Sequence, residues 1–391
     1  MKKLIMLIAL SLLLSSCSTS PAAKMPIEPP KVIKAMETDI PKEKLITVDI
    51  SLKQPIVTNA KLVAVGDILL HQPVYQDAAT AQGGYDFSSM FTKVKPFLEE
   101  ADIAVANQET MIGGAALGLS SYPLFNSPYE IAEALKEAGV DVVTIANNHT
   151  LDKGETAIVN ATNHWNSIGM TYTGAFKSEE DRDVIRTINK NGISFSFLAY
   201  SYGTNGLPVP KDKSYLINLI DLALIKEDVE NAKALSDVVV VSMHWGNEYE
   251  TSPNPTQLDL AKKLSAMGVD IIIGHHPHVL QPMDWIERVD GSRTLVMYSL
   301  GNFLSSQEGV ERLTGGIGGV EITKTAYPGK SVITLSTPSF VPTYGYYKNK
   351  KGFEIIPMVQ LNDSYLPNYL TYYESTQNHM MTFIKDLTFH E

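Results

Sequence analysis

Three histidines within four residues are the part of this sequence best suited to bind a metal ion. His275, His276 and His278 follow an apolar run, 271–273, that is typical of a buried strand. Pro277 fixes its own φ and favours an extended backbone at His276, so His276 and His278 converge only if the chain turns after the strand. The segment alone allows two interpretations: a metal site, or a polar turn that caps the strand.

Polar residues end four other apolar runs in the same way. These runs begin at residues 61, 102, 141 and 237, and the groups that follow them are Asp67, then Asn107-Gln108-Glu109, then Asn147-Asn148-His149, then His244-Trp245. In open α/β sheets, ligands bind beyond the carboxyl ends of the strands. The five strand ends therefore predict one assembled site of oxygen and imidazole groups.

Helical segments precede several of these runs, and this order predicts a mainly parallel sheet. Residues 128–138, 227–235 and 255–266 have helical patterns and lead into strands through short Ser-Asp or Gly-Val-Asp junctions. Such alternation is typical of βαβ units. The later strands look antiparallel: 318–323, 331–336 and 353–358. We expect an α/β domain of two sheets over 59–360, with an antiparallel C-terminal portion and a helical extension over 361–391.

The charge balance argues against a general nucleic-acid-binding protein. The 391 residues carry 32 basic and 43 acidic side chains, a net charge of −11, whereas nucleic-acid-binding proteins are usually basic. The chain is also long enough to bury a full core. An anionic substrate must therefore be held by a metal ion or by a few local donors, and not by the overall field.

The first residues predict a lipoprotein signal peptide. Two lysines precede an apolar run, 4–14, that is too short to favour a membrane span. The following Leu-Ser-Ser-Cys at 14–17 resembles a bacterial lipobox, so we expect removal of residues 1–16 and lipidation of Cys17, the only cysteine. The alternative is a cysteine lying by chance in a cleavable signal. Residues 17–58 are rich in proline and are expected to form a flexible tether on the outer side of the membrane.

Six motifs, in this order, resemble the CapA family of capsule-synthesis proteins, which is associated with poly-γ-glutamate. They are Gly66-Asp67-Ile68, Asn107-Gln108-Glu109, Asn147-Asn148-His149 with Asp152 and Gly154, His244-Trp245-Gly246-Asn247-Glu248, the segment 274–279, and Ser299-Leu300-Gly301-Asn302-Phe303. The resemblance covers about residues 60–345. The family resembles calcineurin-like metallophosphoesterases, which implies a four-layer α/β/β/α sandwich with a dinuclear metal site. It also implies an extracytoplasmic domain attached to the membrane.

The resemblance implies a role for each matching residue. The implied metal ligands are Asp67, Glu109, Asn148, His244, His276 and His278. His149 is expected to donate to a phosphate, and Asp152 is the second candidate catalytic residue. Residues expected around the ligands or the substrate are Asn107, Asn147, Trp245 and Asn302. Such ligands suit Mn, Fe, Zn or Mg, and two ions can clamp both oxygens of an in-line displacement.

One position departs from the metallophosphoesterase pattern. Leu69 stands where the Asp-x-His motif has its histidine, and His71 comes two residues later. The sequence therefore allows one or two divalent ions. Three other residues keep a second interpretation: Asp152 as the N-cap of the next helix, Trp245 as ordinary core, and His275 as a neighbour of the ligands.

Two classes of function follow from these residues. The first is a metal-dependent phosphoesterase or other hydrolase that acts on a cell-envelope substrate, which the retained ligands favour. The second is a protein that binds, exports or anchors an anionic polymer together with membrane-bound capsule-synthesis proteins, which the missing histidine favours. We expect a lipid-anchored, CapA-like surface protein for a poly-γ-glutamate-type capsule, with its catalytic status open.

Overall fold

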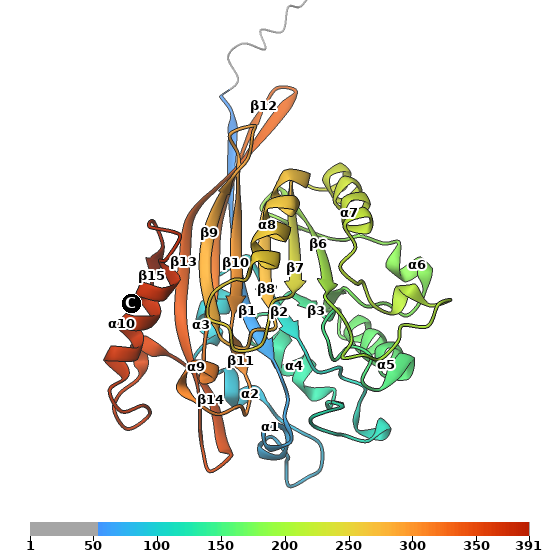
Figure 1. The fold of residues 1–391 in the computed structure, drawn as a ribbon, viewed down its shortest axis with the longest axis vertical. Coiled ribbons are helices and arrows are strands. Elements are labelled where there is room, and N and C mark those ends of the chain that lie inside the picture. Colours follow the sequence, from blue (N-terminus) through green and yellow to red (C-terminus); the bar gives the residue numbers. More distant parts are fainter. Residues whose placement is uncertain (1–53, 391) are drawn as a thin grey trace, which may run out of the picture. The chain divides into compact units, whose positions relative to one another are not determined.

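A computed structural model describes residues 54–390, which form two β-sheets packed face to face between layers of helices (Figure 1). The predicted signal peptide, the predicted lipidation site Cys17 and the tether as far as residue 53 lie outside the described residues. Among the described helices, none is both long enough and apolar enough to cross a membrane.

The first sheet contains nine of the described strands and carries the N-terminal motifs. Its order is β14-β13-β12-β1-β2-β3-β4, with β11 beside β1 and β15 beside β13. The strands β1 to β4 are parallel, whereas β12, β13 and β14 are antiparallel. Their bounds are β1 Ile56–Ile68, β2 Ile103–Gln108, β3 Val142–Thr144, β4 Thr171–Thr173, β11 Asn302–Leu304, β12 Thr314–Tyr327, β13 Lys330–Lys348, β14 Lys351–Pro357 and β15 Thr388–Phe389.

The second sheet contains six of the described strands and carries the histidine motifs. Its order is β5-β6-β7-β8-β10-β9, and the four strands β6, β7, β8 and β10 are parallel. The edge strands β5 and β9 are antiparallel to their neighbours. The bounds are β5 Arg186–Lys190, β6 Ile193–Ser201, β7 Val238–His244, β8 Ile271–His275, β9 Leu280–Glu287 and β10 Arg293–Leu300.

Alternating residues of the central strands build three apolar layers. Along β1, Leu62 and Ala64 face the second sheet, where they pack with Phe195, Val240 and Ile273. The residues between them on β1 face the opposite way, against helices of the first sheet. Successive side chains of a strand point to opposite faces, so this division follows directly from the apolar runs in the sequence.

Helices cover the outer face of each sheet, which confirms the four-layer α/β/β/α arrangement. Those on the first sheet are α1 Gln72–Asp77, α2 Ser88–Phe91, α3 Lys95–Glu99, α4 Glu130–Glu137 and α5 Gly154–Ser167. The second sheet is covered by α7 Leu222–Leu235 and α8 Pro255–Met267. Three further helices are α6 Glu179–Arg182, α9 Val310–Leu313 and α10 Tyr369–Met380.

The predicted antiparallel C-terminal portion is confirmed by strands β12 to β14. The predicted extension over 361–391 is only partly helical, because β15 follows α10 and pairs with β13. Met380 of α10 is buried in the layer between the two sheets. The C-terminal segment is thus packed onto the domain by apolar contacts and by a short strand pairing.

Two glycines allow close approaches of the backbone beside the histidine and aspartate motifs. A Cβ atom at Gly66 would lie 2.0 Å from the carbonyl oxygen of Gly301, and one at Gly274 would lie 1.9 Å from that of Tyr298. Neither distance is compatible with a side chain. These contacts fix the positions of Asp67, which donates its N–H to Gly301 at 2.9 Å, and of His275 at the end of β8.

Candidate metal centre

The predicted metal ligands come together at the carboxyl ends of strands from both sheets. The first sheet provides Asp67 from β1, Glu109 after β2 and Asn148 after β3. The second sheet provides His244 at the end of β7, together with the histidines at and after the end of β8. Parallel strands end at one edge of a sheet, so two stacked sheets bring both groups of ligands to one place.

Asp67 is buried and satisfied by neighbouring protein groups. Its carboxylate accepts the side-chain N–H of Asn107 at 2.8 Å and the backbone N–H of His276 at 3.3 Å. The Nδ1 atoms of His275 and His278 lie 3.3 Å and 3.1 Å from its two oxygens. Burial tends to raise the pKa of Asp67, but the interactions with these imidazoles outweigh burial and hold the pKa well below its usual value.

Glu109 is equally buried, but its carboxylate has no hydrogen-bond partner for either oxygen within the described residues. Its Oε1 lies 3.6 Å from Nε2 of His278 and 3.7 Å from Nε2 of His244. Burial, aided by the charge of Asp67, raises the pKa of Glu109 well above its usual value, against the effect of His278. An unpartnered buried carboxylate is costly, and a bound cation removes that cost.

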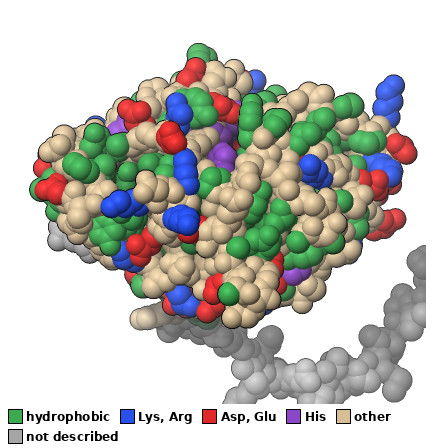
Figure 2. All heavy atoms as spheres, turned by 90° about the horizontal axis from the view of Figure 1, so that it is seen from below, with side chains coloured by type: hydrophobic (Ala, Val, Ile, Leu, Met, Phe, Trp, Pro, Cys, Tyr) green, Lys and Arg blue, Asp and Glu red, His purple; other side chains and the backbone are tan. Residues whose placement is uncertain are grey.

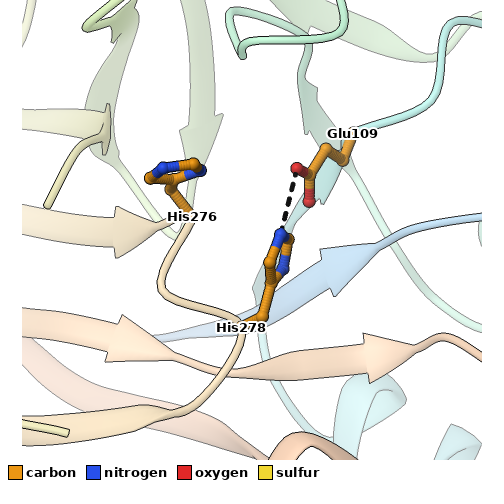
Figure 3. Close-up of side chains that lie close together, drawn as sticks. All are labelled: Glu109, His276 and His278. Carbon is orange, nitrogen blue, oxygen red and sulfur yellow. Dashed lines mark ion pairs between the residues drawn. The ribbon is translucent and has the colours of Figure 1, made fainter. Parts of the chain in front are cut away.

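Glu109, His276 and His278 present their ligand atoms to one another (Figure 3), and the three atoms lie within 4.8 Å of one another. Two ligands that each bind an ion at about 2.1 Å lie roughly 3.4 Å apart in tetrahedral geometry. The separations from Glu109 to His244 and His278 are close to that value. The donor set and its unpartnered atoms therefore fit a divalent metal ion.

His244 and Asn148 extend the cluster on the side of the second sheet. Nε2 of His244 lies 2.8 Å from Oδ1 of Asn148, and its Nδ1 has no partner within the described residues. Burial, reinforced by the charge of His276, lowers the pKa of His244 well below its usual value. A neutral imidazole and an amide oxygen are the forms that coordinate metal ions, so both side chains fit the predicted ligand set.

The backbone after β8 is strained at two of the histidines. His276 has a φ of 96° and His278 a φ of 57°, both in the left-handed region that non-glycine residues rarely adopt. The expectation of an extended backbone at His276 was therefore wrong. The N–H of His276 bonds to Asp67, and this contact requires the chain to turn sharply. Such strain costs about 1–3 kcal/mol per residue and tends to occur at functional sites.

His149 and Asp152 form a pair beside the centre. Nδ1 of His149 lies 2.7 Å from Oδ2 of Asp152, which also accepts the backbone N–H of Phe125 at 2.7 Å. Asp152 therefore orients the imidazole and does not cap a helix. The next helix begins at Gly154, with Lys153 at its N-cap position. The charge of His149 contributes to the low pKa of His276, about 3, after burial and the charge of His278.

Three asparagines hold the ligands in place. Asn107 donates to Asp67, and Oδ1 of Asn302 lies 3.1 Å from Nδ1 of His278. Asn302 also donates to the backbone carbonyls of His278 and Arg312. Asn147 shapes the turn after β3, since it accepts from the N–H of His149 and donates to the carbonyl of Gln108. All three side chains act through neighbouring residues of the centre.

Trp245 lies away from the ligands. Its ring is buried in the outer apolar layer of the second sheet, and its indole N–H donates to the carbonyl of Tyr298 at 3.0 Å. The structure thus places Trp245 in the core, in agreement with its interpretation as an ordinary core residue. Its role is to support the strand ends that carry His244 and His275.

The histidine missing after Asp67 is not replaced by His71. His71 contacts the carbonyl of Leu69 and the edge of the Phe125 ring, and burial lowers its pKa to about 4. His275 instead approaches Asp67, and neither of its ring nitrogens has a hydrogen-bond partner within the described residues. His275 is thus a further candidate ligand. Its position as the last residue of β8 is the sequence signal that pointed to it.

Two tyrosines and one arginine at the edge of the centre were missed by the sequence analysis. The ring of Tyr202 lies 4.7 Å from that of His276, and the ring of Tyr249 lies 6.2 Å from that of His278. The guanidinium of Arg312 lies 4.1 Å from the centre of the Tyr249 ring. Tyr249 follows directly after the 244–248 motif, which was the only available signal. Arg312 lies nine residues after Phe303, the end of the last motif, and belongs to none of the motifs.

Figure 2 views the molecule from below, the end at which the parallel strands β6, β7 and β8 terminate, and histidine side chains are visible on this face. Basic side chains lie beside them, and apolar side chains lie close by. The candidate ligands are almost fully buried, with at most 4% exposure. Tyr202, Tyr249 and Arg312 form the rim of the centre. A substrate would therefore meet this rim before it meets the ligands.

A comparison with protein families identifies the class to which this fold and centre belong. The family described as bacterial capsule synthesis protein PGA_cap matches residues 61–307, which include all the proposed ligands. The chain therefore belongs to this family.

Curated relatives carry names that agree with this membership. The chain is 30% identical to capsule biosynthesis protein CapA of Bacillus anthracis over 256 residues, which are 63% of this chain and 60% of that protein. It is 31% identical to PGA biosynthesis protein CapA of Bacillus subtilis (strain 168) over 251 residues, 62% of each chain. A probable polyglutamine synthesis accessory protein of Mycobacterium tuberculosis is 25% identical over 221 residues, 54% of this chain and 57% of that protein. The chain thus spans about 60% of the length of the two Bacillus relatives.

Solved structures show weaker similarity. A putative 5'-nucleotidase from Staphylococcus aureus has a TM-score of 0.44 at 14% identity, covering 82% of this chain and 58% of that one. The sulfate thiohydrolase SoxB of Thermus thermophilus has a TM-score of 0.40 at 12% identity, covering 81% and 61%. TM-scores below 0.5 do not assign an activity to this chain.

Proposed function

We propose that this chain is a lipid-anchored, extracytoplasmic protein that acts in the synthesis, export or anchoring of a poly-γ-glutamate-type capsule polymer. Family membership and the names of the Bacillus relatives support the capsule role. The membrane contact is a lipid on Cys17. The proposed partners are the anionic polymer itself and membrane-bound capsule-synthesis proteins.

The observation that supports a metal-dependent role is that the buried carboxylate of Glu109 has no hydrogen-bond partner within the described residues. Both of its carboxylate oxygens lack hydrogen-bond partners in the described residues, although the side chain is fully buried and faces three imidazoles. Folding a charged group into such a position is unfavourable unless a cation joins it. One or two divalent ions, Mn, Fe, Zn or Mg, satisfy the carboxylate.

The residues that would hold these ions are Asp67, Glu109, Asn148, His244, His276 and His278, with His275 as a further candidate. When bound, the ions would supply Lewis-acid chemistry to an oxyanion of the substrate. Asn107 and Asn302 would orient Asp67 and His278. The aromatic and basic rim would admit an anionic chain to the centre.

The alternative function is an active metal-dependent phosphoesterase or other hydrolase of the cell envelope. The pair formed by His149 and Asp152 favours it, because a carboxylate at 2.7 Å fixes the tautomer and the orientation of an imidazole beside the metal ligands. Such a histidine can donate a proton or a hydrogen bond to a developing negative charge.

Metal content tests the proposed centre. We expect the full chain, purified in detergent without chelator, to hold one or two divalent ions per molecule. His276→Ala and His278→Ala should lose most of this metal, because each removes a ligand. His164→Ala is a matched control, since His164 lies on α5, where it pairs with Glu133. Metal-free native protein would contradict the centre, and hydrolysis of a generic phosphodiester only by metal-loaded protein would establish the alternative function.

The lipid anchor is tested separately. Cys17→Ser should move the protein from the membrane fraction to the soluble fraction and abolish incorporation of labelled palmitate. The reason is that Cys17 is the only cysteine in the chain, and the described residues contain no membrane-spanning helix. Unchanged membrane association in this variant would contradict lipid anchoring and leave the metal centre unaffected.

A further inference from the structure

Arg312 is a basic residue at the edge of the metal centre. Within the described residues its guanidinium forms neither an ion pair nor a side-chain hydrogen bond, although the side chain is only partly exposed. Lys350, by contrast, forms an ion pair with Glu308 at 2.8 Å and donates to the carbonyl of Ser306. Arg312 is therefore available to an anion, although the chain as a whole carries a net charge of −11.

The guanidinium of Arg312 lies over the face of an aromatic ring. It lies 4.1 Å from the centre of the Tyr249 ring, and that ring lies 6.2 Å from the ring of His278. A guanidinium carries its N–H groups in one plane, where they can meet both oxygens of a carboxylate. The contact with Tyr249 thus holds a bidentate hydrogen-bond donor for an anion one ring away from a metal ligand.

The backbone around both residues is fixed by the centre itself. Tyr249 has a φ of 66°, and its N–H donates to the carbonyl of Pro277 at 2.7 Å, between the two histidine ligands. The carbonyl of Arg312 accepts from Asn302 at 2.9 Å, and Asn302 also contacts His278. A bulky residue in the left-handed region is unfavourable, and such strain persists where the surroundings enforce it.

We propose that Tyr249 and Arg312 form a subsite that binds a carboxylate of the polymer next to the metal centre. The inference rests on the proposed function, because a γ-linked glutamate chain carries one free carboxylate per residue. While one glutamate unit of the polymer lies at the metal centre, Arg312 binds the carboxylate of a neighbouring unit. The subsite sets the register of the polymer and selects a polyanion over a neutral chain.

The test compares two arginines whose guanidinium groups lie at the same distance from an aromatic ring. Arg293 lies 4.1 Å from the ring of Trp285, at the start of β10 and therefore at the opposite end of that strand from Asn302. We expect Arg312→Gln to weaken binding of a short γ-linked glutamate oligomer to the full, metal-loaded chain about tenfold, the loss typical of a charge-assisted pair. Arg293→Gln should change the affinity less than twofold. Tyr249→Phe should keep the affinity, whereas Tyr249→Leu should weaken it.

The outcomes separate this inference from the proposed function. Equal oligomer affinity in native protein and Arg312→Gln overturns the subsite, and metal content measured on the same samples reports independently on the centre. Failure of native protein to bind the oligomer also overturns it. If inorganic phosphate binds instead, and Arg312→Gln weakens that binding, the subsite takes phosphate and the carboxylate assignment is wrong.

Discussion

The two buried acids of the centre differ in what the protein provides for them. Asp67, on β1, has an amide, a backbone N–H and two imidazoles around its carboxylate, and its pKa is lowered. Glu109, after β2, has no hydrogen-bond partner in the described residues, and its pKa is raised. Both acids nevertheless face the ring of His278.

In the metal-free protein this difference gives Asp67 a structural role that Glu109 does not have. The partners of Asp67 already satisfy its charge, so Asp67 connects the first sheet to the histidine turn even without a metal ion. Glu109 has no hydrogen-bond partner within the described residues, and its Oε1 only approaches Nε2 of His278 and of His244, at 3.6 Å and 3.7 Å. A bound cation would supply the partner that its carboxylate lacks. Burial tends to lower the pKa of His278, but the charges of Glu109 and Asp67 outweigh burial and raise this pKa to about 9, so the imidazole is the shared partner of both acids.

The largest expected effect is a difference in stability between variants of the two acids in metal-free protein. Asp67→Asn should lower the free energy of unfolding by about 3 kcal/mol, because it leaves His278 with a broken buried pair. Glu109→Gln should leave this free energy unchanged or raise it. Denaturant unfolding in the presence of chelator measures both values, and equal losses would contradict the distinction. Glu230→Gln, on the exposed face of α7, is the control.

The pH dependence of the metal-free protein sharpens the same comparison. A raised pKa at Glu109 means that the folded state keeps a proton that the unfolded state releases near pH 4.5, so stability should fall as pH rises above 4.5. The lowered pKa of Asp67 has the opposite effect on how stability changes with pH. Its contribution is present above pH 3.8 and is lost as pH falls below that value. Glu109→Gln should remove the loss of stability above pH 4.5 and keep the loss of stability below pH 3.8.

A smaller effect is expected from the residue that orients the shared imidazole. Asn302→Ala should lower metal affinity ten- to a hundredfold, the usual cost of removing a partner that positions a ligand. Competition with a fluorescent chelator measures this affinity. Asn163→Ala, on the exposed side of α5, should show native affinity. Native affinity in Asn302→Ala would mean that His278 is positioned by Asp67 alone.

The smallest effects distinguish the two histidines that are candidates for the missing ligand. His275→Ala should lower metal affinity by less than tenfold, because Asp67 keeps its other partners, whereas His71→Ala should leave it within twofold of the native value. The physical reason is that His275 lies 3.3 Å from Asp67, while His71 contacts Leu69 and Phe125. A loss in His71→Ala with none in His275→Ala would reverse this assignment.

Local patterns in the sequence predicted much of the fold. Apolar runs that end in Asp, Asn or His gave the strands β1, β2, β3, β7 and β8, and the helical segments before them gave α4, α7 and α8. The strand pairing of β15 with β13 was not predicted, since a two-residue strand has no period to detect. The signal peptide, the lipid on Cys17 and the domain boundaries stay predictions.

The chain's sequence by itself determined which residues end the strands, because the period of a strand and its polar last residues are local properties. The sequence therefore predicted the acids, amides and imidazoles of the centre. Only the tertiary structure decided how these groups pair: that Asp67 is satisfied and Glu109 is not, that Trp245 belongs to the core, and that His275 approaches Asp67 in place of His71. Pairing depends on how two sheets stack and on turns with positive φ, and neither is encoded in the spacing of residues along one strand.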